Sequence, residues 1–391
     1  MVLDLGVSYS YESQSAFDVA ASSNNTPVFL IGFAPNAVEA DFPLDTLVLI
    51  DSPTKAEQVF GANLTDNDFL LPVEILHRNG CRFIVCVRVE KGVDEATDLT
   101  NIIGTDQPRT GLNLLKSFYS EYGEYPIVFA ICNEVVGTDD TILTDILAIA
   151  NDANSSYVFN FAEGTLVTDA VTTRQTDAGF GTKDYRLIPC YGTLYHTDTP
   201  AKKEPLKYHL MAAFASVFED NPGWSPGGQL AAGVDKIVET MVLSTTDENS
   251  DNEKLTDEGV VCPNRITIPV EDITGTVAKN SIVTWGTRNG AYPDDQTQFS
   301  YLQALPFRDA IKGVLDARST LFLHRPCDVA NGRAIERSCN NILGEWDVKT
   351  KLLESRSDFV NNYLEFNVLY SINNVTERLH FNITLVVDQG R

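Results

Sequence analysis

Histidine, cysteine and the acidic residues are the side chains that could carry catalysis or hold a metal ion in this 391-residue chain. A catalytic zinc site on a helix needs two histidines one turn apart with a glutamate beside the first, as in HExxH. No such spacing occurs among the five histidines, at positions 77, 196, 209, 324 and 380. His196 stands two residues before Asp198, but within a polar loop, HTDTPAKKE. The histidines therefore predict neither a metal site nor an acid–base pair.

Phosphate-binding loops and activated serines are also missing from the sequence. A nucleotide phosphate needs a GxxxxGK[ST] or GxGxxG loop, whose backbone N–H groups surround its oxygens. The nearest segment, GFGTK at 179–183, is too short, and no glycine-rich loop follows the strand-like VFLIGFAP. Gly32 in that strand is interpreted as a packing residue, and no GxSxG elbow presents a hydrolase serine. We expect no cofactor, metal or catalytic residue, and a nucleotide-binding α/β enzyme or a hydrolase is the less favoured alternative.

Seven cysteines lie scattered along the chain, at 81, 86, 132, 190, 262, 327 and 339. None forms the CxxC pair of a zinc site, and most stand in apolar stretches such as CRFIVCV. We expect buried, inert thiols, because free cysteine is among the most buried residue types. The first residues, MVLDLGVSYSYES, have neither basic residues nor an apolar core, so they predict no signal peptide and a cytoplasmic origin.

The net charge of −25 is distributed unevenly. Residues 1–280 hold 17 basic and 41 acidic residues, a net of −24, whereas residues 281–391 hold 12 and 13, a net of −1. This acidity argues against nucleic acid as a partner, because phosphates would be repelled. We expect the near-neutral C-terminal part to meet other protein, although solubility alone also explains the asymmetry. No apolar run reaches the 18 residues typical of a membrane helix.

Hydrophobic periodicity predicts alternating strands and helices from Pro27 to about residue 220, an order typical of a mostly parallel sheet. One expected helix has Thr54 and Glu57 spaced as a capping box. The acidic stretch 244–258 is predicted to be a solvated loop. Expected strands are VFLIGFAP, LVLI, 82–89, PIVFAIC, YVFNFAEG and YRLIPCYGTLYH, and from about residue 281 follow the strand SIVTW, helices at 306–318 and 331–343, and the strands YLEFNVLY and ERLHFNITLVV.

Both ends of the chain carry strand patterns that could pair outside their own domain. Near the N-terminus Val7, Tyr9 and Tyr11 alternate with serines before a linker, ASSNNT. Adding such a strand to the sheet edge of a neighbour is a known mode of association, and exchanged strands join protomers without a new fold. The alternative is that both strands pair within their own chain. The C-terminal alternation consists of Leu379, Phe381, Ile383, Leu385 and Val387.

Five segments of the chain form an ordered pattern: IDSPTKAEQVFG with LLPVEILHRNGCRFIVCVRV, TGLNLLKSFYSEYGEYPIVFAIC, DNPGWSPGGQLAAGV, SIVTWGTRN, and PFRDAIKGVLDARSTLFLHRP. In this order, from about residue 27 to the C-terminus, they resemble the contractile tail sheath proteins of phages, in their compact P2- and Mu-like branch. Two departures concern loops: Gly228 stands where asparagine is usual, and Asn289 where threonine is usual.

The resemblance implies a multi-domain chain of α/β and α+β parts. It implies an N-terminal arm and linker at 1–25 and a small α/β domain at 26–105. A central α/β domain at 106–280 would share the subtilisin backbone topology without its catalytic triad. An α+β sheath domain at 281–376 and a C-terminal arm strand at 377–391 would complete the chain. In the family, both arms add strands to the C-terminal domains of neighbouring subunits.

For function, the resemblance implies a non-enzymatic virion protein, assembled in the host cytoplasm. Its partners would be copies of itself in stacked hexameric rings, the tail tube protein, the baseplate and the tail terminator, with no nucleic acid and no membrane insertion. Contraction would rotate rigid subunits about flexible arms into a lattice of lower energy, without nucleotide hydrolysis. A tailocin sheath or a secretion-type contractile injection system is the alternative setting.

Overall fold

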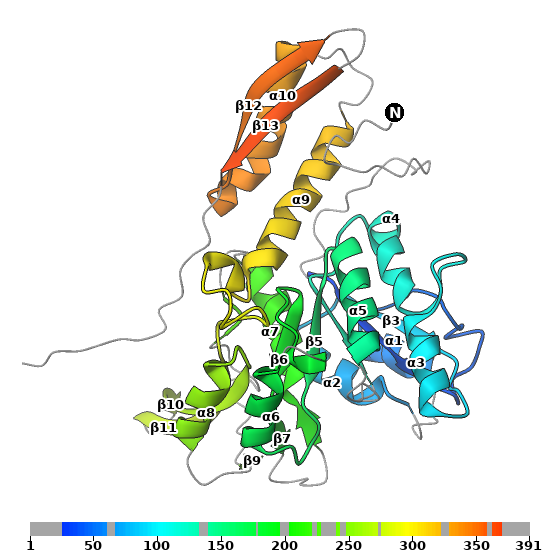
Figure 1. The fold of residues 1–391 in the computed structure, drawn as a ribbon, viewed down its shortest axis with the longest axis vertical. Helices are drawn as coiled ribbons and strands as arrows, with labels where there is room; N and C mark the ends of the chain where they lie inside the picture. The colour runs from blue at the N-terminus through cyan, green and yellow to red at the C-terminus, as the bar shows by residue number, and fades with distance from the viewer. Residues whose placement is uncertain are drawn as a thin grey trace, which may run out of the picture.

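The computed structural model describes most of the chain between residues 26 and 369, and Figure 1 shows an α/β body from which a smaller helix-and-strand unit projects. The predicted arms at 1–25 and 377–391 lie outside the described residues. The described ranges are 26–60, 67–132, 140–176, 179–195, 203–220, 225–227, 240–242, 248–272, 275–321, 328–357 and 362–369.

A six-stranded sheet forms the centre of the body, in the order β2-β3-β1-β4-β5-β6. All neighbours are parallel except β2, which pairs antiparallel with β3 at one edge. This confirms the mostly parallel sheet predicted from the alternation of elements. The sheet spans the boundary that the sequence placed after residue 105, and the five-part domain division stays a prediction. The strands are β1 (Val28–Phe33), β2 (Val48–Ile50), β3 (Ile84–Val89), β4 (Val128–Ile131), β5 (Ser156–Asn160) and β6 (Leu187–Cys190).

Helices cover both faces of the sheet, which explains why its strands read as continuous apolar runs. On β1, Val28 and Leu30 belong to one buried cluster and Phe29 and Ile31 to the other. The first face packs against α1 (Pro53–Phe60), α2 (Leu70–Arg78) and α7 (Leu206–Asp220). The second face packs against α3 (Glu95–Ile103), η1 (Gly111–Ser117), α4 (Phe118–Tyr122) and α5 (Asp140–Asp152).

The acidic stretch predicted as a solvated loop contains a helix instead, α8 (Glu248–Thr256). Its Leu255 is fully buried with residues of α6 (Val167–Arg174), and Asn252 donates to the carbonyl of Pro263 at 3.3 Å. The loop was predicted because six acidic residues dominate the composition of this stretch. Its single buried leucine and the buried polar side chains beside it give no hydrophobic periodicity that would indicate a helix. The predicted capping box was wrong too, because Ser52 caps α1 by accepting from the N–H of Lys55 at 3.3 Å.

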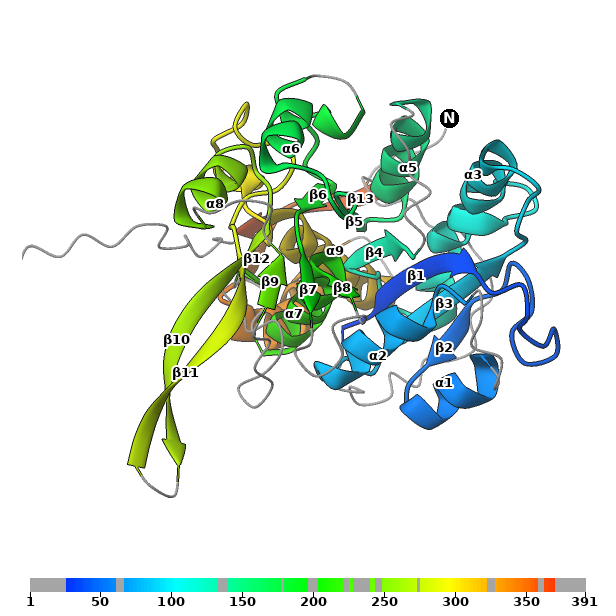
Figure 2. The same ribbon diagram turned by 90° about the horizontal axis from the view of Figure 1, so that it is seen from below.

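Two smaller β structures extend the body. The three-stranded sheet β8-β7-β9 joins β7 (Thr193–Tyr195), β8 (Lys203–Pro205) and β9 (Thr240–Val242). The antiparallel ribbon of β10 (Cys262–Asp272) and β11 (Gly275–Trp285) is paired along its whole length. Figure 2 shows this ribbon projecting away from the helices and the central sheet.

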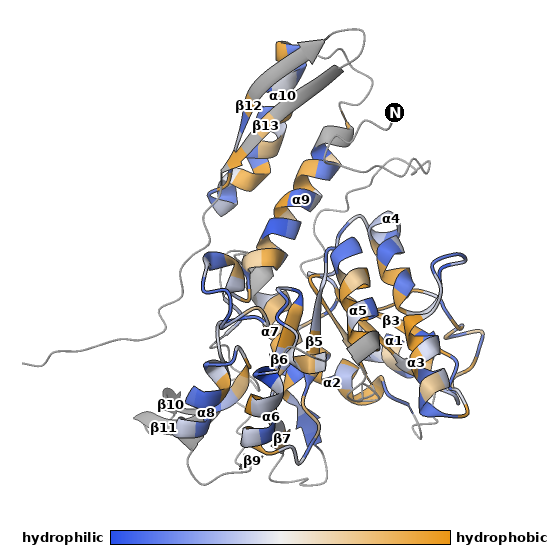
Figure 3. Ribbon diagram, viewed as in Figure 1, coloured by the Kyte–Doolittle hydropathy of each residue, from blue (hydrophilic) through white to orange (hydrophobic). Residues whose placement is uncertain are grey.

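The last described part of the chain is a separate helix-and-strand unit. Two short 3₁₀ helices belong to the body, η2 (Gly179–Gly181) after α6 and η3 (Gln298–Ser300) just before α9. Helix α9 (Ala304–Thr320) then leaves the body and is followed by α10 (Val329–Leu343), η4 (Gly344–Trp346), β12 (Lys349–Ser357) and β13 (Asn362–Leu369). In Figure 3 hydrophobic and hydrophilic residues mix along α9 and α10, as expected of helices buried on one side. Both predicted helices and the strand YLEFNVLY are confirmed, whereas β12 was not predicted.

Candidate functional site

The sequence placed the functional residues in the two arms, and all eight lie outside the described residues. They are Val7, Tyr9, Tyr11, Leu379, Phe381, Ile383, Leu385 and Val387. Their role therefore stays a prediction. The described residues instead show the surface that an arm strand could meet, and the contacts that hold this surface to the body.

Enzymes with parallel sheets hold their ligands at the carboxyl ends of the strands, so these ends test the enzyme alternative. The amine of Lys207 is buried there and donates to the carbonyl of Ile131 at 3.0 Å. Asn160 donates to the carbonyls of Phe161 at 2.8 Å and Gly192 at 3.2 Å. These polar side chains satisfy backbone carbonyls, a structural role.

The cysteines behave as the sequence predicts. Five of the six in the described residues are buried, and Cys132 is half-buried. Burial raises the pKa of the Cys132 thiol well above its ordinary value and that of Cys339 to about 11. Such thiols stay protonated at neutral pH and are poor nucleophiles. In the parts of the chain described here, no three His, Cys, Asp or Glu residues gather as a metal site, and no helix could cross a membrane.

A buried ionic cluster that the sequence did not reveal joins α2 to α7. Glu204 accepts from both guanidinium Nη atoms of Arg78 and lies 3.0 Å from Nε2 of His209. Burial by itself raises the pKa of Glu204, but the hydrogen bonds from His209 and Arg78 outweigh it, so the pKa lies well below its ordinary value. The carboxylate is therefore charged and neutralised by its neighbours. The sequence analysis missed this ionic cluster because Glu204 and His209 stand five residues apart across a strand–helix junction, a spacing that matches no known motif.

Two segments of the family resemblance meet in the structure. From NPGWSPGG the structure describes residues 225–227, and Thr284 of the segment SIVTWGTRN donates to the carbonyl of Pro226 at 3.1 Å. A Cβ at Gly227 would lie 2.1 Å from the carbonyl oxygen of Gly286, so only glycine fits there. The threonine and the glycine therefore allow the backbones of two segments that are distant in the sequence to lie in close contact.

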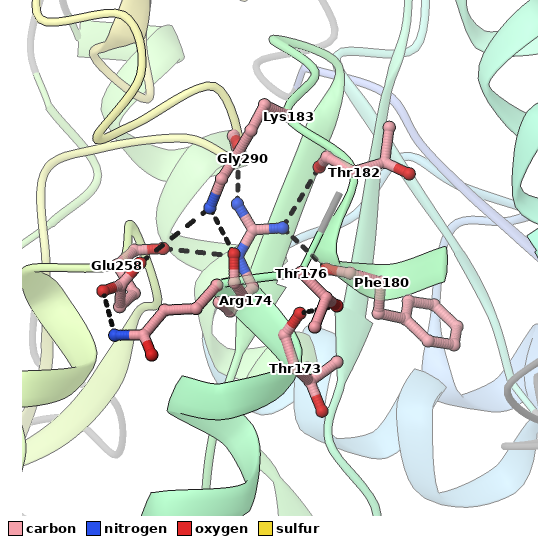
Figure 4. Close-up of polar contacts among 9 residues, drawn as sticks. Thr173, Arg174, Thr176, Phe180, Thr182, Lys183, Glu258 and Gly290 are labelled. Atoms are coloured by element: carbon pink, nitrogen blue, oxygen red, sulfur yellow. Dashed lines mark hydrogen bonds and ion pairs between the residues drawn. The ribbon is translucent and has the colours of Figure 1, made fainter. Parts of the chain in front are cut away.

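Arg174, at the end of α6, joins three further segments, as Figure 4 shows. Its fully buried guanidinium donates to the carbonyls of Phe180 at 2.6 Å, Thr182 at 3.1 Å, Gly290 at 2.6 Å and Glu258 at 3.3 Å. Burial lowers its pKa to about 10, which still leaves it charged at neutral pH. Carbonyl oxygens thus surround the cation and fix the loop at 286–290 against α6 and the end of α8.

The other side of this loop is fixed to η3, just before α9. The guanidinium of Arg288 lies 3.9 Å from the ring centre of Tyr301 and donates to the hydroxyl of Ser300 at 2.7 Å. Asn289 donates to the carbonyl of Phe299 at 2.9 Å and accepts from the N–H of Ala291 at 3.1 Å. Asn289, unusual for the family at this position, is therefore used as both donor and acceptor.

Helix α9 is fixed to the body by a buried ion pair. Arg186, beside β6, donates to the carboxylate of Asp309, and both side chains are nearly inaccessible to solvent. Farther along α9, the hydroxyl of Tyr125 donates to Asp316 at 3.4 Å. Burial raises the pKa of Asp316 above its ordinary value. Separating α9 from the body would leave Arg186 and Asp309 without their partners, so this pair favours the observed position of the helix.

At the far end of the molecule, β12 and β13 pair antiparallel and pack on α10. Thr350 is buried and the half-buried Leu352, Phe366 and Val368 pack toward the helix, whereas Lys349 and Lys351 are exposed. A Cβ at Gly332 of α10 would lie 2.6 Å from a methyl of Leu352, so this glycine permits the close approach. One face of this small sheet is thereby covered by its own helix.

Side chains of α10 also bind the backbone of β12. Asn340 donates to the carbonyl of Thr350 at 2.9 Å and accepts from its N–H at 2.7 Å. Glu336 accepts from the N–H of Leu352 at 3.0 Å. The unit is therefore held by polar contacts at one strand edge as well as by apolar packing, and its remaining edge is the candidate interaction site.

The described contacts define a body around the six-stranded sheet, a helix α9 paired with it through Arg186 and Asp309, and a two-stranded sheet at one end. Solved structures identify the fold. The chain matches a chain of the contracted anti-feeding prophage baseplate with a TM-score of 0.65 and 14% identity, over 100% of this chain and 99% of the other. It matches a chain of the contracted PVC sheath complex, an extracellular contractile injection system, with a TM-score of 0.63 and 13% identity, over 98% and 99%.

A sheath tail protein from Desulfitobacterium hafniense matches with a TM-score of 0.52 and 9% identity, over 94% of this chain and 100% of the other. No protein-family model and no curated protein sequence matches the chain. The chain therefore has the fold of contractile sheath proteins along its whole length, and the resemblance seen in the sequence is confirmed at the level of the fold.

The cluster at Glu204 makes stability depend on pH. Replacing Glu204 by Gln leaves Arg78 without its carboxylate, and we expect the free energy of unfolding at pH 7 to fall by about 3 kcal/mol. Because the folded-state pKa is lowered, this stabilisation is present above the ordinary pKa of 4.5 and is lost as the pH falls. The difference between wild type and variant in urea unfolding should therefore shrink below pH 4.5. Glu163→Gln, in an exposed pair with Lys203, is the control and should cost at most about 1 kcal/mol.

The ion pair on α9 is tested by Asp309→Asn. The buried Arg186 then lacks its counter-charge, and we expect a loss of about 3 kcal/mol of unfolding free energy. Hydrogen exchange should show the backbone amides of α9 losing protection before those of the central sheet. The exposed Glu345→Gln serves as the matched control. Equal protection of α9 in both variants would contradict the rigid connection.

The contact between Asn340 and β12 is tested by Asn340→Ala. The N–H and carbonyl of Thr350, a residue only 2% exposed, then lose their partners, and we expect a loss of about 2 kcal/mol. The neighbouring Asn341 is exposed, and Asn341→Ala should change the unfolding free energy by no more than about 0.5 kcal/mol. Similar losses in the two variants, measured by denaturant unfolding, would disprove the role of Asn340.

Proposed function

We propose that this chain is the structural subunit of a contractile sheath and polymerises with copies of itself around an inner tube. The observation that carries the proposal is the full-length likeness to chains from contractile injection systems and to a sheath tail protein. Stacked hexameric rings, the tube, the baseplate and the tail terminator are partners that the sequence resemblance implies.

The setting that best fits the comparisons is a contractile injection system of the extracellular type. The descriptions of the anti-feeding prophage and PVC structures support this setting over the phage tail that the sequence favoured. A phage tail sheath and a tailocin sheath are the variants of the same proposal. In each of these settings the proposed subunit would act by strand addition and rigid-body movement.

The proposed subunit acts without catalysis. The sheath likeness supports this, and so does the structural use of Lys207, Asn160 and the buried thiols at the carboxyl ends of the sheet. The energy of contraction would be stored in the extended polymer and released as subunits reach a lattice with more favourable contacts. The subtilisin-like topology of the central domain belongs to this proposal, and the six-stranded, mostly parallel sheet supports an α/β fold there. The five-part domain division also belongs to the proposal, although this sheet runs across the boundary placed after residue 105.

Rigid subunits are central to this mechanism, because energy stored between subunits is lost if each subunit bends. The Arg186–Asp309 pair and the carbonyl shell around Arg174 support a body that moves together with α9. Movement would then occur in the arms, at 1–25 and 377–391, whose strands would pair with the C-terminal domains of neighbours.

Polymerisation of the purified chain tests the proposal. Negative-stain electron microscopy over a range of concentrations, with and without a tube protein as template, should show hollow cylinders or stacked rings. The full-length variant Ile383→Asp puts a charge into the apolar face of the C-terminal arm. It should remain folded, with an unchanged melting temperature, and fail to form cylinders. Small uniform particles of wild type under every condition would disprove the sheath proposal.

A further inference from the structure

Helix α8 carries two buried polar side chains on the side that faces the base of the β10–β11 ribbon. Asp251 is 4% exposed and Asn252 is 3% exposed. Both lie within one helical turn of Leu255, which packs in one cluster with Cys262 at the start of β10. Residues three and four positions apart share a helix face, so Asp251 and Asn252 flank Leu255 on the side toward the ribbon. Figure 1 shows α8 beside the base of the ribbon.

One oxygen atom of each side chain has no donor within the described part of the chain. Oδ2 of Asp251 and Oδ1 of Asn252 are shielded from solvent and accept no hydrogen bond from any described residue. The exposed Lys254 reaches only the other carboxylate oxygen of Asp251, at 3.2 Å. Burying a charged oxygen without a partner is unfavourable. A bound cation would remove this cost for both atoms at once.

The atoms next to Asn252 on the ribbon are oxygens as well. Nδ2 of Asn252 donates to the carbonyl of Pro263 at 3.3 Å and to Oδ1 of Asn264 at 3.2 Å. A carbonyl oxygen has two lone pairs, so each of these acceptors can bind a further group. The base of the ribbon therefore brings together carboxylate, amide and backbone carbonyl oxygens. Oxygens of these three kinds, without histidine or cysteine, are the ligands that calcium prefers.

We propose that Asp251 and Asn252 bind a calcium ion between α8 and the start of β10, through Oδ2 and Oδ1. Pro263 and Asn264 would offer further oxygens, and water would complete the roughly six to eight ligands that calcium takes. Because only one ligand is charged, we expect a dissociation constant on the order of 10⁻⁴ to 10⁻³ M. The inference does not depend on the proposed function, since the site lies within one subunit.

The charge of the surrounding sequence favours a cation over a buried water molecule. Positions 244–258 hold six acidic residues and one lysine, and their field attracts cations without defining a site by itself. A water molecule could donate to both oxygens, but the buried charge of Asp251 would then be balanced only by the exposed Lys254. The site needs a single acidic ligand, which agrees with the described residues, where no three His, Cys, Asp or Glu side chains gather.

Calcium titration of two matched variants tests the site. Asp251→Asn and Asp257→Asn remove one negative charge each from the same stretch, but Asp257 is exposed just after α8. Calcium should raise the melting temperature of the full-length wild type by mass action. Asp251→Asn should weaken calcium binding by about tenfold or more, and Asp257→Asn by less than about twofold. Asp251→Asn should fold, because it removes a buried charge.

Equal weakening in the two variants would show diffuse attraction to the acidic stretch and would overturn the site. So would the absence of any effect on wild type at about 10 mM calcium, well above the expected dissociation constant. Hydrogen exchange adds a local readout. In wild type, calcium should slow the exchange of backbone amides in α8 and at the start of β10, and in Asp251→Asn it should not.

Terbium, a luminescent substitute for calcium, locates the bound ion. Trp285 is the cross-strand partner of Cys262, so it stands at the base of the ribbon near the site and should excite terbium bound there. Calcium should displace the terbium. Trp285→Phe should remove most of the emission while leaving the stabilisation by calcium unchanged. Full emission in this variant would place the ion elsewhere and contradict the proposal.

Asn252→Asp gives a second variant with the opposite expected sign. It sets a second carboxylate beside Asp251 and loses the donation to Pro263 and Asn264. We therefore expect a lower melting temperature without calcium. With calcium, the added negative ligand should tighten binding by about tenfold, so the stabilisation by calcium should exceed that of wild type. A calcium effect no larger than in wild type would disprove the role of Asn252 as a ligand.

Discussion

The buried ion pair between Arg186 and Asp309 is the contact on which the arrangement of the whole molecule depends. It links the last strand of the central sheet to the helix that carries the C-terminal unit. A charge at either position is tolerated inside the protein only while its partner is in place. The pair therefore favours one position of α9 relative to the body, together with the apolar packing of Phe307 and Ile311. The carbonyl shell around Arg174 and the stacked Arg288 fix the intervening loop in the same way.

Much of the central sheet could be predicted from the sequence, because strands buried on both faces leave continuous apolar runs such as VFLIGF and IVCVRV. Helices α9 and α10 were predicted from their apolar stripes for the same reason. Helix α8 was missed because its single buried leucine is surrounded by acidic residues, so composition outweighs periodicity. Strand β12 was missed because its sequence, KTKLLESRS, alternates poorly across its bulge.

The candidate site was less accessible to sequence reasoning. The motif SIVTWGTRN was singled out by resemblance, but its physical role depends on contacts outside the motif, of Thr284 with Pro226 and of Asn289 with Phe299. The hydrogen bonds of Asn340 and Glu336 to the backbone of β12 could not be predicted at all. A polar side chain that binds a strand backbone and one that faces solvent look the same in a sequence. Such contacts become visible only once the register of the strands is known.

The ribbon of β10 and β11 has a mechanical consequence. Eleven residues in each strand rise by about 36 Å at roughly 3.3 Å per residue, so the tip of the ribbon stands far from the core that anchors its base. The distance between the core and any contact made at the far end of the ribbon would therefore be set by the length of its strands. Inserting two residues into each strand would move the tip outward by about 7 Å while the side-chain alternation and the core remain unchanged.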